Sequence, residues 1–129
     1  MKTILIADDD PVMVKLLEFT LQRAGFGVLV CREGLSVMAR VREGRPDLIV
    51  LDVMLPGRSG LELLRDCKDD AELAKLPVVV VTSQGKNSTQ DELLAAGALN
   101  VFTKPFSPTM LIARLRELLN EPGAAPKGI

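Results

Sequence analysis

Charged residues that suit phosphate chemistry follow three short apolar runs of this chain. They are the cluster Asp8-Asp9-Asp10 after Thr3–Ala7, Asp52 after Leu48–Leu51, and Lys104 after Ala98–Thr103. If the runs are neighbouring parallel strands, the carboxylates and the ammonium meet at one edge of one sheet. Adjacent carboxylates need a divalent cation, and a carboxylate beside a cation and a lysine can accept a phosphoryl group. The pattern therefore predicts a metal site that accepts phosphate.

Asp52 carries the chemistry of this prediction. It follows four apolar residues in what should be the central strand, where an unpaired carboxylate is costly. As a nucleophile toward phosphorus it would form an acyl phosphate, whose oxygens a metal and an ammonium would stabilise. Lys104 precedes Pro105, which disfavours the helical conformation and should hold the lysine extended at a strand end.

Other residues complete the predicted site. Thr82 offers a hydroxyl to a phosphoryl oxygen, and Ser83 beside it presents a small side chain. The backbone carbonyl of Met54 is placed to complete a metal shell, and a cluster of oxygen ligands suits Mg²⁺. Asp10, followed by Pro11, is expected only to cap a helix.

The length and composition are those of one globular domain. The chain has 129 residues, of which 47% are hydrophobic and 26% charged, and its net charge is −1. This charge predicts no direct binding of nucleic acid and no general attraction to a membrane. The apolar runs are far shorter than the roughly 20 residues that span a bilayer, and no secretory signal is recognisable, so we expect a cytoplasmic protein. Cys31 and Cys67 occur without histidine or CxxC spacing, which argues against zinc and favours reduced, partly buried thiols.

Apolar runs of strand length alternate five times with longer amphipathic segments. The predicted strands are Thr3–Ala7, Gly27–Cys31, Asp47–Leu51, Val78–Val81 and Ala98–Thr103. The predicted helices lie between Asp10 and Gly25, at Leu35–Glu43, at about 61–68, at Asp91–Ala96 and after Ser107. This alternation predicts an α/β fold, a doubly wound five-stranded parallel sheet with five helices on both faces. We expect one domain over residues 1–120 and a flexible tail or linker stub over residues 121–129.

Four motifs resemble those of a known family, the receiver (phosphoacceptor) domain of bacterial two-component response regulators. They are Ile4-Leu5-Ile6-Ala7-Asp8-Asp9-Asp10-Pro11, Leu51-Asp52-Val53-Met54-Leu55-Pro56-Gly57, Val80-Val81-Thr82-Ser83 and Thr103-Lys104-Pro105-Phe106. The resemblance covers residues 3 to about 119. It implies the flavodoxin-like strand order 2-1-3-4-5.

The resemblance also implies roles for the site residues. Asp52 would be the phosphoacceptor, taking its phosphoryl group from a sensor histidine kinase or a phosphotransfer protein. The implied Mg²⁺ ligands are Asp9, Asp52, the Met54 carbonyl and, through a water, Asp8, and the implied phosphate-binding residues are Thr82, Ser83 and Lys104. Phosphorylation would change the surface of the fourth helix, fifth strand and fifth helix. That surface would bind or release a downstream effector protein or a C-terminal output domain missing from this sequence. The family implies no enzyme beyond Mg²⁺-dependent self-phosphorylation and slow self-dephosphorylation.

Three features of the predicted switch and output surface bear on how it works. An aromatic residue usually lies three places before the lysine, but here Val101 stands there, and Phe102 should point to the opposite face of the strand. Arg114 belongs to a helix face through which related receivers dimerise. The acids that usually pair with that arginine are replaced by Leu99-Asn100, so we expect a monomer or weak dimer. Gln84 stands at a position that tunes how fast the phosphate is lost.

Two alternatives to a phosphorylated receiver use the same fold. One is a phosphate-independent protein-interaction module, which the Val101 departure favours. The other is a phosphatase with an aspartyl nucleophile, although such enzymes generally have a second aspartate where this chain has Met54. The chain has neither a GxxxxGK[ST] motif nor a GxGxxG motif after the first strand, which argues against nucleotide-binding folds.

Overall fold

A computed structural model describes residues 1–83 and 90–120. The expected tail at residues 121–129 and the position of Gln84 lie outside the described residues.

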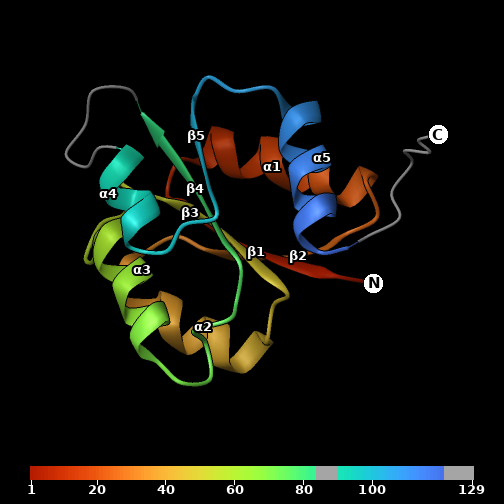
Figure 1. Ribbon diagram of the computed structural model, residues 1–129. Coiled ribbons are helices and arrows are strands. Elements are labelled where there is room, and N and C mark those ends of the chain that lie inside the picture. Colours follow the sequence, from red (N-terminus) through yellow and green to blue (C-terminus); the bar gives the residue numbers. More distant parts are fainter. Residues whose placement is uncertain (84–89, 121–129) are drawn as a thin grey trace.

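Five parallel strands form one sheet in the order β2-β1-β3-β4-β5 (Figure 1). The strands are β1 (Thr3–Ala7), β2 (Gly27–Cys31), β3 (Leu48–Asp52), β4 (Val78–Ser83) and β5 (Asn100–Lys104). Every residue of the central strand β3 is buried, as its unbroken apolar sequence predicted. The predicted fold class and the flavodoxin-like strand order are confirmed.

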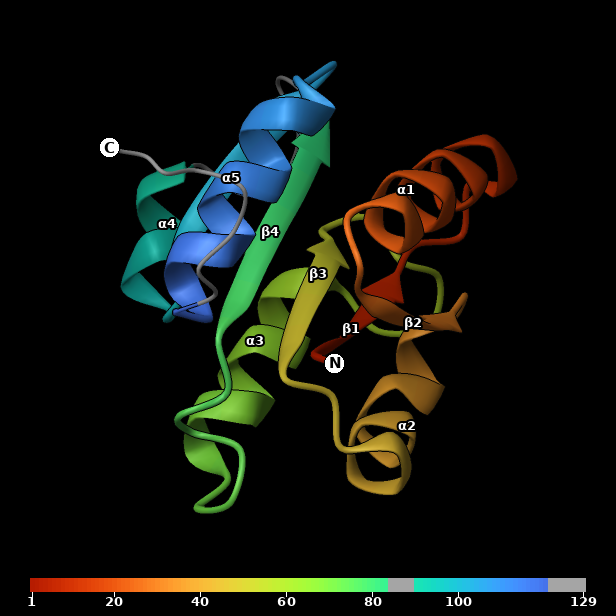
Figure 2. The same cartoon turned by 90° about the vertical axis from the view of Figure 1, so that its right-hand side faces the viewer.

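The helices cover both faces of this sheet (Figures 1 and 2). They are α1 (Pro11–Arg23), α2 (Val37–Gly44), α3 (Gly60–Asp69), α4 (Gln90–Ala95) and α5 (Pro108–Leu118), with a short 3₁₀ helix η1 (Gly34–Ser36) before α2. Two separate hydrophobic cores result: α1 and α5 pack on one face of the sheet, and α2, α3 and α4 pack on the other.

Helix caps fix where the chain turns at the carboxyl edge of the sheet. The Asp10 side chain accepts a hydrogen bond from the Val12 N–H at 3.0 Å, as its sequence context predicted. Ser107 caps α5 in the same way, with the Met110 N–H donating at 3.2 Å. Helix α1 therefore begins directly after the acidic cluster, and the acids stay at the edge of the sheet.

The helix predicted at Leu35–Glu43 has a different start. Residues Gly34–Ser36 form η1, and α2 begins only at Val37. Leu35, the first residue of the predicted helix, is 74% exposed, whereas Val37 is buried. The reason is that the Leu35 side chain lies over Gly57 of the loop between β3 and α3, outside the core.

The last strand begins two residues later than predicted and ends at Lys104. The Ala98 N–H donates to the carbonyl of Leu93 at 3.1 Å, so Ala98 closes α4 instead of entering the sheet. Strand β4 continues past the valines to Ser83, and β3 includes Asp52. The acid and the lysine are thus parts of strands, which fixes their backbones.

Cys31 and Cys67 form no disulfide, and both are buried more deeply than the partial burial that was predicted. Within residues 1–83 and 90–120, no helix has the length and apolar character needed to cross a bilayer.

Candidate functional site

Three acidic side chains meet at the carboxyl edge of the sheet. Asp8 and Asp9 directly follow β1, and Asp52 is the last residue of its neighbour β3. One carboxylate oxygen from each of the three lies within 4.8 Å of the others. Asp8 and Asp52 are only 2% and 5% exposed, while Asp9 is exposed to solvent. The structure therefore brings together the acids that the sequence placed at this edge.

Lys104 reaches these acids from the end of β5, on the far side of β4. Its Nζ lies 3.5 Å from Asp8 Oδ2 and 3.7 Å from Asp52 Oδ2. The lysine side chain is mostly buried, so solvent screens these attractions only weakly. One ammonium group is thus shared between two buried carboxylates.

The Asp8 carboxyl is strongly affected by its buried position. Its pKa is raised to about 6, mainly by burial and also by the nearby charge of Asp52, while a hydrogen bond from the Asp10 N–H and the charge of Lys104 oppose the shift. That hydrogen bond is 2.9 Å long, and Asp52 accepts one from the Met54 N–H at 3.1 Å. A single ammonium therefore compensates the two buried acids incompletely.

The donor atoms suit a small, hard cation. Three carboxylates supply only oxygen ligands, and the exposed Asp9 leaves room for coordinated water, which Mg²⁺ retains readily. A bound Mg²⁺ would supply the positive charge that the buried acids lack and would neutralise phosphoryl oxygens beside Asp52.

Thr82 and Ser83 end the strand between the acids and the lysine. In the sheet register Asp52 lies beside Val81, so Thr82 is one residue further toward the edge, where it is buried. The backbone of Ser83 pairs with that of Lys104. Strand β4 therefore ends between Asp52 and Lys104.

Val101 and Phe102 lie on opposite faces of β5. Val101 packs against the core under α2, α3 and α4, and Phe102 packs against the core under α1 and α5. The ring of Phe102 meets that of Phe106 edge to face, at a centroid distance of 6.0 Å. The prediction that the aromatic side chain points away from the Val101 face is confirmed.

Arg114 makes contacts that the sequence did not suggest. Its Nε donates to Asn100 Oδ1 at 2.9 Å, and its Nη1 lies 3.1 Å from a carboxylate oxygen of Glu117. The Glu117 contact has ordinary helical spacing, but the Asn100 contact joins β5 to α5 and depends on how the two elements pack. No local pattern signals it.

A cavity of about 620 Å³ opens beside the acids. Asp9, Met54, Ser59 and Glu92 are among its lining residues, so it lies between the loop after β3 and helix α4. Met54 is 45% exposed there. A partner's side chain can therefore approach the acidic cluster from this direction.

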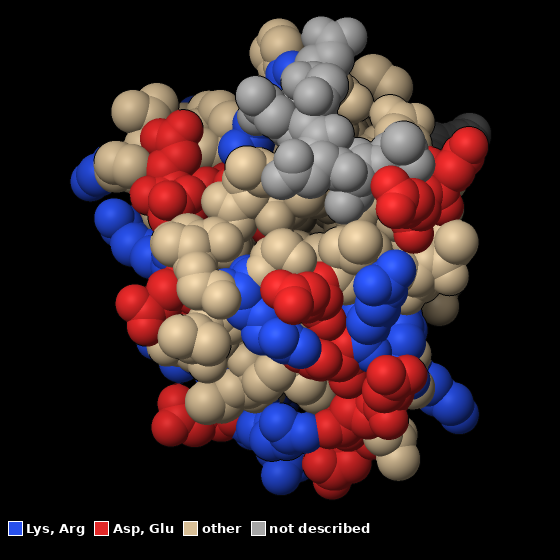
Figure 3. Space-filling view, turned by 90° about the vertical axis from the view of Figure 1, so that its left-hand side faces the viewer, with Lys and Arg blue, Asp and Glu red and all other residues tan. Residues whose placement is uncertain are grey.

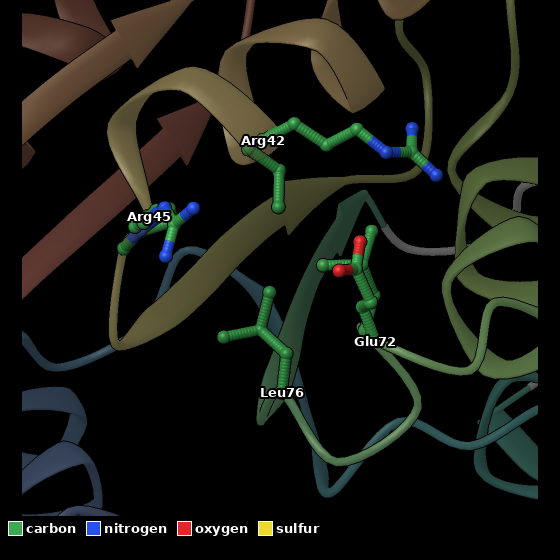
Figure 4. Close-up of a pocket in the computed structure, with 7 residues that line it drawn as sticks. Arg42, Arg45, Glu72 and Leu76 are labelled. Carbon is green, nitrogen blue, oxygen red and sulfur yellow. The ribbon is translucent and has the colours of Figure 1, made fainter.

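A second cavity, of about 370 Å³, lies at the opposite edge of the sheet (Figure 4). It is formed by the end of α2 and the segment before β4, with Arg45 and Glu72 on opposite sides and Leu76 between them. Since Arg45 precedes β3 and Leu76 precedes β4, this cavity is separated from the acids by the length of the strands.

Charges of both signs are interspersed on the face that carries α3 and α4 (Figure 3). The ion pairs of Arg58 with Glu62 and Asp66 on α3 are examples of this mixing. This face therefore presents no broad field of one sign to a charged partner.

Comparison with known proteins identifies the family. The model of the response regulator receiver domain matches residues 4–116, so the chain belongs to this family, a class of two-component signalling domains. The resemblance drawn from the four motifs is thereby confirmed.

Curated relatives and solved structures agree with this assignment. The phosphate regulon transcriptional regulatory protein PhoB of Pseudomonas aeruginosa is 38% identical over 122 residues, which cover 95% of this chain and 53% of that protein. The DNA-binding response regulator MtrA of Mycolicibacterium smegmatis is 39% identical over 118 residues, covering 90% of this chain and 50% of that protein. The chain thus spans about half the length of these relatives.

Two solved structures have closely similar folds. A putative response regulator from Chloroflexus aurantiacus superposes with a TM-score of 0.87 at 32% identity, covering 92% of this chain and 98% of that one. The beryllofluoride-activated N-terminal receiver domain of RstA from Klebsiella pneumoniae gives a TM-score of 0.84 at 31% identity, with the same coverage.

Membership of the family defines the general activity. Receiver domains are signalling domains and not enzymes in the ordinary sense, they bind Mg²⁺ at an acidic pocket, and they interact with histidine kinases and effector domains. Asp8, Asp9 and Asp52 form an acidic cluster at the carboxyl edge of the sheet in this chain.

Proposed function

We propose that Asp52 accepts a phosphoryl group from the phosphohistidine of a sensor histidine kinase or a phosphotransfer protein. The observation that carries this proposal is the shared ammonium: Lys104 Nζ lies 3.5 Å from Asp8 and 3.7 Å from Asp52, both buried. A buried pair of acids with one cation is ready to receive a second cation and an anionic group together. In this proposal residues 1–120 form the receiver domain.

The transfer is a displacement at phosphorus. A carboxylate oxygen of Asp52 forms the new O–P bond, and the P–N bond to the donor imidazole breaks, with its electron pair returning to the imidazole nitrogen. The cation ligands are Asp9, Asp52, the Met54 carbonyl and, through water, Asp8. Thr82, Ser83 and Lys104 bind the phosphoryl oxygens.

The output follows from the movement of Thr82 and Lys104 toward the new phosphoryl group. Thr82 ends β4 and Lys104 ends β5, so their displacement biases the surface formed by α4, β5 and α5. Val101 takes the usual aromatic position on this surface, and Arg114 lies at its α5 side. An effector protein, or a DNA-binding output domain such as the relatives' names suggest, would read this change.

Phosphorylation with a small donor tests the proposal. Wild-type protein and the isosteric variant Asp52→Asn are incubated with acetyl phosphate, with and without Mg²⁺, and weighed intact. We expect one added phosphoryl group on the wild type only, and only with Mg²⁺. Modification of Asp52→Asn to the same extent contradicts the role of Asp52. Rapid release of phosphate over many turnovers would instead support a phosphatase.

Two adjacent acids provide a matched control for the metal. Asp9→Asn removes a proposed Mg²⁺ ligand, whereas Asp10→Asn changes an acid whose observed contact is to the Val12 N–H, a contact that asparagine also makes. We expect Asp9→Asn to abolish both Mg²⁺ binding, measured by calorimetry, and phosphorylation. Asp10→Asn should retain both. Equal loss in the two variants would show only a nonspecific effect of negative charge.

A further inference from the structure

The loop between β3 and α3 presses against a distant part of the chain. Gly34, the first residue of η1, donates its N–H to the carbonyl of Pro56 at 2.8 Å. A Cβ placed on Gly34 would lie 2.2 Å from the backbone oxygen of Arg58 and 2.6 Å from its nitrogen. Atoms that are not bonded to each other cannot come this close, so only glycine lets these two backbones approach so closely.

The same loop is held from its other side by α3. The Arg58 guanidinium makes two hydrogen bonds to Asp66, of 2.6 and 2.9 Å. Ser59 and Glu62 form a capping box, with the Ser59 side chain accepting from the Glu62 N–H. The peptide unit of Arg58 is therefore fixed between η1 and α3.

This loop connects directly to the acidic pocket. It carries Met54, whose N–H donates to Asp52 at 3.1 Å. The strand before Gly34 touches the other half of the pocket, since the carbonyl of Cys31 accepts from the Asp8 N–H at 3.0 Å. The segment from Cys31 to Gly34 thus contacts the backbone on both sides of the cluster, and it fixes the spacing between them.

We infer that Gly34 and Arg58 are positioning residues for the Mg²⁺ site, forming a two-sided clamp that holds the Met54 carbonyl at the proper distance from the acids. The inference rests on the proposed function, because it assumes that this carbonyl is a metal ligand. Both residues act through the loop and not by direct contact with the cluster of Asp8, Asp9 and Asp52. Mg²⁺ demands strict octahedral geometry. A small displacement of one ligand therefore lowers the affinity for the cation more than it lowers the stability of the fold.

Two pairs of variants test the clamp. Gly34→Ala is compared with Gly44→Ala, because a Cβ on Gly44 meets only the mobile end of the Leu29 side chain. Arg58→Ala is compared with Arg42→Ala, which removes the surface ion pair of Arg42 with Asp70, away from the loop. Each protein is titrated with Mg²⁺ by calorimetry and unfolded with urea in the presence of EDTA.

We expect Gly34→Ala and Arg58→Ala to weaken Mg²⁺ binding by about tenfold, in the range found for residues that orient metal ligands. Gly44→Ala and Arg42→Ala should bind within about twofold of the wild type, whatever their stability. If Gly34→Ala does not fold, the Arg58 pair decides alone. Wild-type affinity in Arg58→Ala, or in a folded Gly34→Ala, overturns the clamp. A wild type that binds no Mg²⁺ instead overturns the proposed function on which it rests.

Discussion

At the residue scale, the environment of Asp8 shows why this pocket needs positive charge. Asp8 is almost completely buried, and its burial raises its pKa to about 6 even though Lys104 lies 3.5 Å away. Two buried carboxylates repel each other, and one ammonium shared between them offsets this only in part. A divalent cation and the ammonium therefore act on the same two acids.

We predict that Lys104→Met raises the affinity for Mg²⁺. The ammonium is replaced by an apolar group of similar length, which removes its repulsion of the cation. An increase of about tenfold, or about 1.4 kcal/mol, is expected for removing a charge at this range. Calorimetric titration with Mg²⁺ measures it.

Lys68→Met is the matched control for this change. Lys68 on α3 donates to the carbonyls of Ala74 and Leu76, at 3.1 and 3.4 Å, so its ammonium is engaged by the segment before β4. Its replacement should leave Mg²⁺ affinity unchanged. A Lys104→Met protein that binds Mg²⁺ more weakly than the wild type would mean that the lysine supports the metal site instead of competing with it.

At the element scale, α2 and α3 pack through sulfur. Cys67 on α3 is 2% exposed, and its thiol lies 3.8 Å from the Met38 sulfur on α2. Burial raises the pKa of Cys67 to about 11 from an ordinary value of 9.0. The contact between the two helices therefore requires the neutral thiol.

This packing predicts a loss of stability at alkaline pH. The pKa of Cys67 is higher in the folded state than in the unfolded state. The contribution of its neutral thiol to the stability is therefore complete below about pH 9 and is lost as the pH rises from about 9 to 11. At about pH 10 the thiol is mostly ionised in the unfolded state but not in the folded state, which lowers the free energy of unfolding by roughly 1.4 kcal/mol. Urea unfolding of wild type and Cys67→Ala at about pH 8 and pH 10 measures it. The stability advantage of the wild type should shrink by this amount, and an advantage that does not change with pH contradicts the prediction.

Local chemistry made most elements predictable, and tertiary contacts explain the exceptions. The capping residues Asp10 and Ser107 predict where α1 and α5 begin, because a side-chain oxygen must satisfy free N–H groups at the start of a helix. The later start of α2 was not predictable, because the contact of Leu35 with Gly57 joins segments far apart in the chain. The same holds for Gly34 against Arg58, where the sequence shows two ordinary loop residues and the structure shows a close backbone contact.

At the scale of the whole molecule, the convergence of the site is a property of the topology. The order β2-β1-β3-β4-β5 places the ends of β1 and β3 side by side and brings β5 within reach across β4. Strand patterns and the position of the acids predicted this edge. The strand order itself followed from the family resemblance, because parallel strands joined by helices permit several orders. The finer distances depend on side-chain packing, which no spacing in the sequence records.

The last prediction concerns association through α5. Arg114 is engaged within the chain by Asn100 and Glu117, so it offers little to a second molecule. Leu94 and Leu99 are each about half exposed and provide a modest apolar surface. We therefore expect the beryllofluoride-treated protein with Mg²⁺ to dimerise with a Kd on the order of 100 μM or weaker. Sedimentation equilibrium of wild type and Arg114→Ala measures this. Both should behave alike, because an arginine whose partners already lie within its own chain contributes little to an interface. A tight dimer of the wild type that Arg114→Ala dissociates would show that the arginine leaves Asn100 on activation and pairs across the interface.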